Sequence, residues 1–162
     1  MEAHYYEVNV NWNKERRGMM CSPDLSMGIS GAGGCIEVAT PPEFPKGIPG
    51  IWSPEHLFTA AVSSCLMTTF LAIAENSKLE FIAFQCDAKG KLEQVDGKFL
   101  MTEVLLTPRV TIADERDREK TEKVLLKSEA ACLISNSIRS KVTMNPIIEM
   151  ARQKETSLVG SH

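Results

Sequence analysis

Hydrophobic and polar residues alternate along several stretches of the chain with the two-residue period of a β-strand. In residues 5–12, Tyr6, Val8, Val10 and Trp12 fall on one side and mostly polar residues on the other. This pattern predicts a half-buried strand over residues 5–12. Further strands are predicted at residues 19–22, 27–30, 35–39, 81–92, 98–112 and 141–150, the last of them interrupted by Pro146 and therefore an edge strand.

A long apolar stretch interrupts this β-rich pattern. Residues 57–74 contain no charged side chain. Just before them, Ser53, Pro54 and Glu55 provide an N-cap, a favoured first helical residue and an acidic first turn. We therefore expect a helix from this point to about Asn76. Its apolar character nearly all round predicts a buried central helix.

The same stretch lies at the lower length limit of a transmembrane helix. Five hydroxyl side chains within it, and flanks without a Lys/Arg bias, argue against a membrane span. The N-terminus lacks the basic and apolar regions of a signal peptide. We expect no membrane partner. A core helix of this length is long for one small domain to cover, which suggests that a second subunit contributes to its burial.

A hairpin and a second helix complete the predicted order of elements. The Asp96–Gly97 dipeptide predicts the turn between the strands at 81–92 and 98–112. Asp114 is the expected cap of a second helix, which is charged at first and apolar from Val124 onward. With 162 residues and no internal repeat, the chain is predicted to be a single α+β domain over residues 1–162.

Charge and cysteine content narrow the classes of function. The chain has 18 Lys+Arg and 21 Asp+Glu, a net charge of −3, so no nucleic-acid partner is expected. Its five cysteines are odd in number and show no CxxC or CxxH spacing, which supports neither a disulfide framework nor a metal site. Free thiols predict a reducing, cytoplasmic location. We interpret Cys21, Cys35 and Cys86 as structural.

Two cysteines belong to the predicted helices. Cys65 is in the middle of the apolar helix and Cys132 at the end of the second one. From position alone, each could be a small buried hydrophobic residue. A cysteine hydrolase is not predicted, because His56 is nine residues before Cys65 and lies on the opposite side of the helix.

Four segments resemble, in order, the motifs of the OsmC/Ohr family (osmotically induced protein C and organic hydroperoxide resistance proteins). Residues 52–65 resemble its NPExLFxAAxxxC helix, and residues 131–138 are similar to its CPxSN segment. Residues 15–18 resemble its GRxG turn and residues 39–42 its STP stretch. The chain departs from these motifs in having Glu15 for a glycine, Ser53 for an asparagine and Leu133 for a proline.

The resemblance implies an OsmC-like fold, with antiparallel sheets around a long buried helix in an intertwined homodimer. It implies a peroxiredoxin-like organic hydroperoxide reductase in which Cys65 becomes a sulfenic acid and Cys132 condenses with it to a disulfide. A dithiol or lipoyl-protein then reduces that disulfide, so no metal or other cofactor is expected. The alternative is a non-enzymatic OsmC-like dimer that binds an apolar ligand.

The resemblance also assigns residues around Cys65. Arg16, with Arg17 as the adjacent alternative, is the expected cation that lowers the pKa of the thiol, and Glu55 is expected to hold that arginine. Glu55 and Cys65 are ten residues apart on one helix, roughly 15 Å, so we expect either a glutamate from the partner chain or a long arginine that reaches it. Apolar residues suited to an alkyl or lipid hydroperoxide, equally compatible with core packing, are Trp52, Phe58 and Met67.

Overall fold

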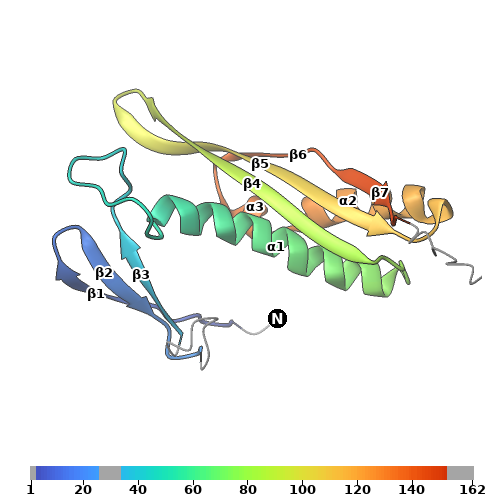
Figure 1. The fold of residues 1–162 in the computed structure, drawn as a ribbon, viewed down its shortest axis with the longest axis horizontal. Helices are drawn as coiled ribbons and strands as arrows, with labels where there is room; N and C mark the ends of the chain where they lie inside the picture. The colour runs from blue at the N-terminus through green and yellow to red at the C-terminus, as the bar shows by residue number, and fades with distance from the viewer. Residues whose placement is uncertain (1–2, 26–33, 153–162) are drawn as a thin grey trace, which may run out of the picture. The chain divides into compact units, whose positions relative to one another are not determined.

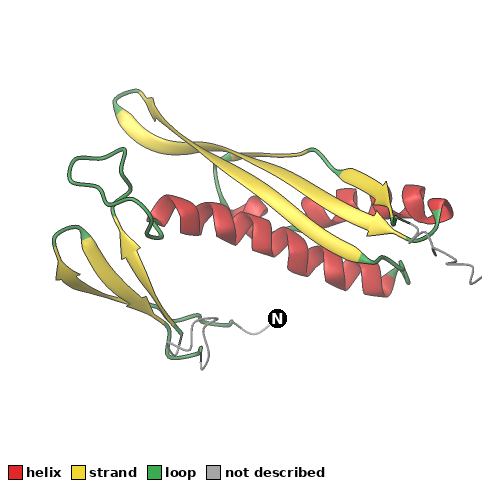
Figure 2. Ribbon diagram, in the orientation of Figure 1, coloured by secondary structure: helices red, strands yellow, loops and turns green. Residues whose placement is uncertain are grey.

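A computed structural model describes residues 3–25 and 34–152 of the chain (Figures 1 and 2). The chain divides into two compact units, Met1–Phe58 and Thr59–His162, which we describe in turn. The strand predicted at residues 27–30 lies outside the described residues. The prediction of a single domain over residues 1–162 stays a prediction.

The first unit contains an antiparallel sheet in the order β1-β2-β3 (Figure 2). The strands are β1 (Asn9–Lys14), β2 (Arg17–Cys21) and β3 (Cys35–Ala39), the last with the predicted bounds. The turn between β1 and β2 places Glu15 at φ 49°, a left-handed conformation that glycine adopts most easily. This explains physically why a glycine suits that position, where the chain departs from the GRxG motif.

The predicted half-burial of the first strand is wrong for this chain alone. The strand begins at Asn9, so Tyr5 and Tyr6 precede it, and all six of its residues are exposed. Val10 and Trp12 are 61% and 75% exposed. The alternation therefore identified an apolar face correctly, but packing against the rest of this chain does not bury it.

The prediction that Cys21 and Cys35 are free thiols is also wrong. They lie opposite each other on β2 and β3 and form a disulfide with a Cα–Cα distance of 4.1 Å. Spacing rules along the chain cannot detect such a pair, because sheet register and not sequence spacing brings the two residues together. The free cysteines are Cys65, Cys86 and Cys132.

The second unit is built on a long hairpin of β4 (Ala83–Val95) and β5 (Lys98–Ile112) (Figure 1). Asp96 and Gly97 form its turn, both with positive φ, as predicted. Two short strands, β6 (Lys141–Met144) and β7 (Ile147–Met150), pair with β5 in parallel. The predicted last strand is thus present at the edge of the sheet but divided at Pro146, which has no amide hydrogen to donate.

Helices cover one face of this sheet. They are α1 (Pro54–Asn76), which begins in the first unit, α2 (Arg118–Ala131) and the short α3 (Leu133–Ser137). The N-terminus and C-terminus of α1 match the prediction, and Ser53 Oγ accepts the His56 amide as an N-cap. The core between the helices and β5 consists of Phe70, Ala74, Leu79, Val110, Ile112, Val124 and Leu125.

The apolar helix α1 is not buried all round in this chain. Its buried residues form one stripe at four-residue spacing: Val62, Leu66, Phe70 and Ala74. On another side, Met67 and Leu71 are 40% and 43% exposed. By length and hydropathy α1 could cross a membrane, which for one helix is weak evidence because core helices of soluble proteins have the same properties. The single chain therefore leaves part of its longest apolar helix uncovered.

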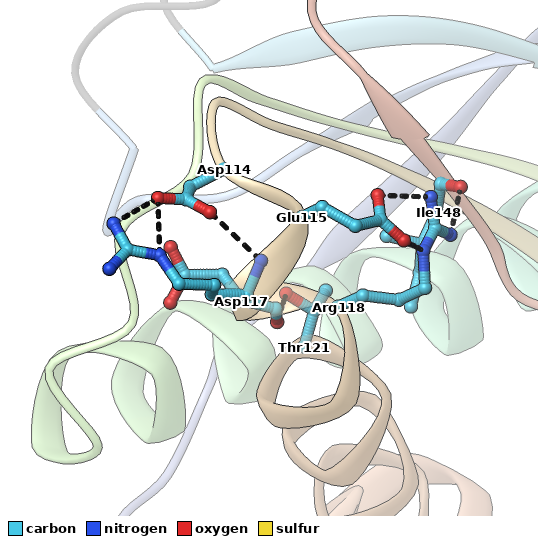
Figure 3. Close-up of polar contacts among 7 residues, drawn as sticks. Asp114, Glu115, Asp117, Arg118, Thr121 and Ile148 are labelled. Atoms are coloured by element: carbon cyan, nitrogen blue, oxygen red, sulfur yellow. Dashed lines mark hydrogen bonds and ion pairs between the residues drawn. The ribbon is translucent and has the colours of Figure 1, made fainter.

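The predicted cap at Asp114 is confirmed, although it starts a short 3-10 helix, Glu115–Asp117, that leads into α2 (Figure 3). Asp114 Oδ1 accepts the Arg116 amide at 2.9 Å, and the Arg116 guanidinium holds the pKa of this carboxyl at about 2. Arg118 donates to the Ile148 carbonyl at 2.7 Å and so ties the start of α2 to β7.

Candidate functional site

The structure brings Cys65 and Cys132 together from positions 67 residues apart in the sequence. Cys65 lies in the middle of α1 and is half-buried. Cys132 is buried at the junction of α2 and α3, where its extended backbone ends one helix and begins the next. The Ile134 amide, two residues after Cys132, donates to Cys65 Sγ at 3.5 Å, and each thiol affects the pKa of the other, so the two cysteines are neighbours in the fold.

Hydrogen-bond donors converge on the Cys65 sulfur. Burial raises the pKa of this thiol, but the donors more than offset it and the net pKa is lowered. The strongest donor is the Ile134 amide, whose nitrogen is 3.5 Å from Sγ. The Cys132 thiol, the Thr69 hydroxyl and the Leu133 amide add to this effect. All of them stabilise the thiolate, which is the reactive form of cysteine.

The pKa of Cys132 is shifted in the opposite direction. Burial raises it most, and a negative charge on Cys65 raises it further. The nearby hydroxyl and amide of Ser135 lower this pKa and offset part of the rise. Near neutral pH, Cys65 is therefore the more acidic thiol of the pair, while Cys132 keeps its proton.

This arrangement can perform thiol chemistry in two stages. Cys65 is partly accessible and can attack an electrophile as a thiolate, and Cys132 is held next to it as a second thiol. Cys86 lacks these features: it lies on β4, where burial raises its pKa. Among residues 3–25 and 34–152, no cluster of three or more His, Cys, Asp or Glu side chains could bind a metal ion.

The predicted charged residues lie in the first unit, and their roles toward Cys65 stay predictions. Arg16 is exposed in the turn after β1. Arg17 begins β2, is 27% exposed and forms an ion pair with Glu37 at 3.4 Å. Glu55 is half-buried in the first turn of α1. The two neighbouring arginines therefore differ: Arg16 is exposed to solvent, whereas Arg17 is half-buried and paired with Glu37 on the next strand.

The pocket role of Trp52, Phe58 and Met67 stays a prediction. Trp52 is half exposed and lines a hollow of about 260 Å³ with Gly50, Ile51 and His56. Its ring meets the His56 ring edge-on at 6.1 Å. Phe58 and Met67 are not part of this lining.

Sequence reasoning missed most of the groups that surround the cysteine pair. Thr69 follows Cys65 by four residues, a spacing that places both on one helix face but does not indicate that the hydroxyl lowers the pKa of the thiol. The amides of Leu133 and Ile134 leave no side-chain signature, because every residue except proline carries one. Ser135 falls in the segment similar to CPxSN, so the motif contained it without indicating its role.

Comparison with known proteins agrees with this architecture. The family model described as OsmC-like protein matches residues 47–146, more than half of the chain. The uncharacterised protein YmaD of Bacillus subtilis is 24% identical over 147 residues, 89% of this chain and 93% of YmaD. An OsmC-like protein of unknown function from Vibrio cholerae has a similar structure, with a TM-score of 0.76, 23% identity and coverage of 90% of this chain and 100% of its own. The organic hydroperoxide resistance protein OhrB of Bacillus subtilis follows with a TM-score of 0.63, 19% identity and coverage of 90% and 98%. The chain belongs to the OsmC-like protein family.

Proposed function

We propose that this protein is a thiol-dependent peroxidase that reduces organic hydroperoxides with Cys65 and Cys132. The observation that carries the proposal is the pair itself: two adjacent thiols whose pKa values are shifted in opposite directions. A structural neighbour from Bacillus subtilis is named an organic hydroperoxide resistance protein, which is consistent with this chemistry.

The first half of the proposed reaction uses the acidic thiol. The Cys65 thiolate attacks one peroxide oxygen, the O–O bond breaks, and the alkoxide takes a proton and leaves as an alcohol. Cys65 is then a sulfenic acid. The groups that lower the pKa of Cys65 are all donors, namely the Ile134 amide and its neighbours, so they favour the attacking thiolate at neutral pH.

The second half uses the buried thiol. Cys132 displaces the hydroxyl from the Cys65 sulfenic acid, which releases water and forms a disulfide between the two sulfurs. An external dithiol returns two electrons and two protons, which restores both thiols and oxidises the dithiol to its own disulfide. The contact between the Ile134 amide and Cys65 Sγ supports this step, because it keeps the segment that follows Cys132 against the Cys65 sulfur.

Peroxide consumption in the presence of a lipoyl dithiol tests the proposal. We expect cumene hydroperoxide to be consumed faster than hydrogen peroxide, and the dithiol to support turnover better than glutathione. Cys65→Ser should abolish consumption, and the control Cys86→Ser should retain it. A fully active Cys65→Ser variant would end the proposal. If the thiols react slowly and the peroxide is not consumed, the result would favour the alternative of a dimer that binds an apolar ligand.

We further propose that the protein works as a homodimer in the cytoplasm, where lipoyl and other dithiol reductants are available. Its exposed apolar residues on β1 and α1, such as Trp12, Met67 and Leu71, are surfaces that a second copy would bury. Sedimentation at micromolar concentration should give a dimer, and Leu71→Glu should weaken it while the control Lys127→Glu should not. A monomer over the whole concentration range would contradict this proposal.

A further inference from the structure

The disulfide between β2 and β3 occupies a defined place in the sheet. The antiparallel pairs of β2 and β3, which we call the ladder, run from Arg17–Ala39 at one end to Cys21–Cys35 at the other. Just beyond this last pair, the Ser22 amide donates to the Gly34 carbonyl at 3.3 Å. Cys21 and Cys35 therefore form a pair without mutual backbone hydrogen bonds, the position where side chains on neighbouring antiparallel strands approach most closely.

The sheet holds the two sulfurs next to each other whether or not they are bonded. The ladder has four further residue pairs, and Thr40 extends it by donating to the Arg16 carbonyl at 3.0 Å. An ion pair between Arg17 and Glu37 spans the same two strands. Because these contacts do not involve the disulfide, its reduction leaves the partners in register and ready to form the bond again.

The pair is also accessible. Cys21 and Cys35 are both half-buried, so part of each residue is exposed to solvent. Thiol–disulfide exchange requires that an incoming thiolate reach one of the two sulfurs. A half-buried cross-strand bond near the end of a ladder meets this condition, in contrast to a disulfide enclosed in a core.

We propose that Cys21 and Cys35 are a second redox site, a reversible thiol–disulfide couple that exchanges with external dithiols. A dithiol thiolate attacks one sulfur, the Cys21–Cys35 bond breaks, and a mixed disulfide forms. The second thiol of the reductant then displaces the protein sulfur, so that two electrons and two protons reach the pair and the reductant leaves as a disulfide. An oxidised dithiol reverses these steps. The site does not depend on the proposed peroxidase activity.

A variant in which only this pair remains isolates the site: Cys65→Ser, Cys86→Ser and Cys132→Ser together. In buffers of increasing reduced-to-oxidised dithiothreitol ratio, we expect titratable thiols to rise from zero to two per chain and to return to zero when the ratio is reversed. Circular dichroism should show a folded protein throughout. The control adds Cys21→Ser, which should leave one thiol per chain without an intramolecular bond.

Differential alkylation of the unaltered chain, read by mass spectrometry, provides a second measurement if the triple variant folds poorly. The labels on Cys21 and Cys35 should change together and independently of those on Cys65 and Cys132. The proposal is overturned if excess dithiothreitol opens the bond only in denaturant, which would make it a structural disulfide. It is equally overturned if the two thiols never pair in oxidised dithiothreitol.

Discussion

Removal of one backbone amide hydrogen tests directly whether amide donors stabilise the Cys65 thiolate. Leu133 is the first residue of α3, and its amide helps to lower the pKa of Cys65. Leu133→Pro removes this N–H and nothing else that contacts the sulfur. Proline is favoured at a first helical position, and the preceding Cys132 already has the extended backbone that proline requires, with φ −63° and ψ 113°.

The expected size follows from the strength of one hydrogen bond to a charged group. Such a bond contributes about 1.5–3 kcal/mol. The Leu133 amide affects the pKa of Cys65 less than the Ile134 amide does. We therefore expect its hydrogen bond to contribute less than this range, roughly 1 kcal/mol. The pKa of Cys65 should therefore rise, and each 1.36 kcal/mol corresponds to about a tenfold change in the ratio of thiolate to thiol. The thiolate fraction at neutral pH should then fall by about three- to tenfold.

The assay is the rate of iodoacetamide alkylation of Cys65 against pH, in a Cys86→Ser background. The matched control is Leu133→Ala, which shortens a side chain that is 68% exposed but keeps the amide. The curve for Leu133→Pro should move to higher pH and the curve for Leu133→Ala should not. If both variants are folded and their curves coincide, the Leu133 amide does not stabilise the thiolate and our reasoning is refuted.

Other parts of the molecule give further predictions. Arg16→Ala should slow alkylation of the reactive thiol several-fold at neutral pH while Arg17→Ala leaves it nearly unchanged; the opposite result would assign the role to Arg17. Gly90→Ala should lower the free energy of unfolding in urea by about 1–3 kcal/mol, because its Cβ would lie 2.2 Å from Thr59 Oγ1; unchanged stability would contradict this clash. Asp114→Ala should lower the melting temperature by a few degrees at neutral pH through loss of the cap. Since the folded pKa of Asp114 is depressed to about 2, this difference should be full above the unfolded pKa of about 4 and should vanish as pH falls through about 2; a difference that persisted at lower pH would contradict the assignment.

Local signals predicted the elements that local chemistry determines. The start of α1 followed from the cap at Ser53, and the β4–β5 turn from Asp96 and Gly97. The bounds of β3 followed from the apolar run that begins at Cys35. In each case the residues that form the element also stabilise its ends or its pleated surface. A short stretch of sequence is therefore enough to predict where the element begins and ends.

Burial could not be predicted in the same way. The apolar pattern at Trp12 and Leu71 indicates a face that favours a nonpolar environment, but it does not say which chain provides that environment. The disulfide between Cys21 and Cys35 depends on strand register, which spacing along the chain does not fix.

The candidate site was predictable only in part. The motif resemblance identified Cys65 and Cys132, but not the main donor to Cys65, the Ile134 amide. A backbone amide acquires such a role only when the fold places it next to the sulfur, and the residue type does not indicate this. The effect of Leu133 is an example: the sequence shows that it departs from a proline motif, and the structure shows that the departure supplies one more donor.

We propose that Cys65 and Cys132 act as one two-electron couple toward organic hydroperoxides. One equivalent of cumene hydroperoxide, added to the protein with its thiols reduced, tests it directly by thiol titration and peptide mass spectrometry. The account predicts the rapid loss of two thiols per chain and a peptide pair linked through Cys65 and Cys132, with Cys132→Ser leaving a sulfenic acid at Cys65 that a cyclic dione traps. Thiols that survive the peroxide, or a linkage that omits Cys65, would contradict it.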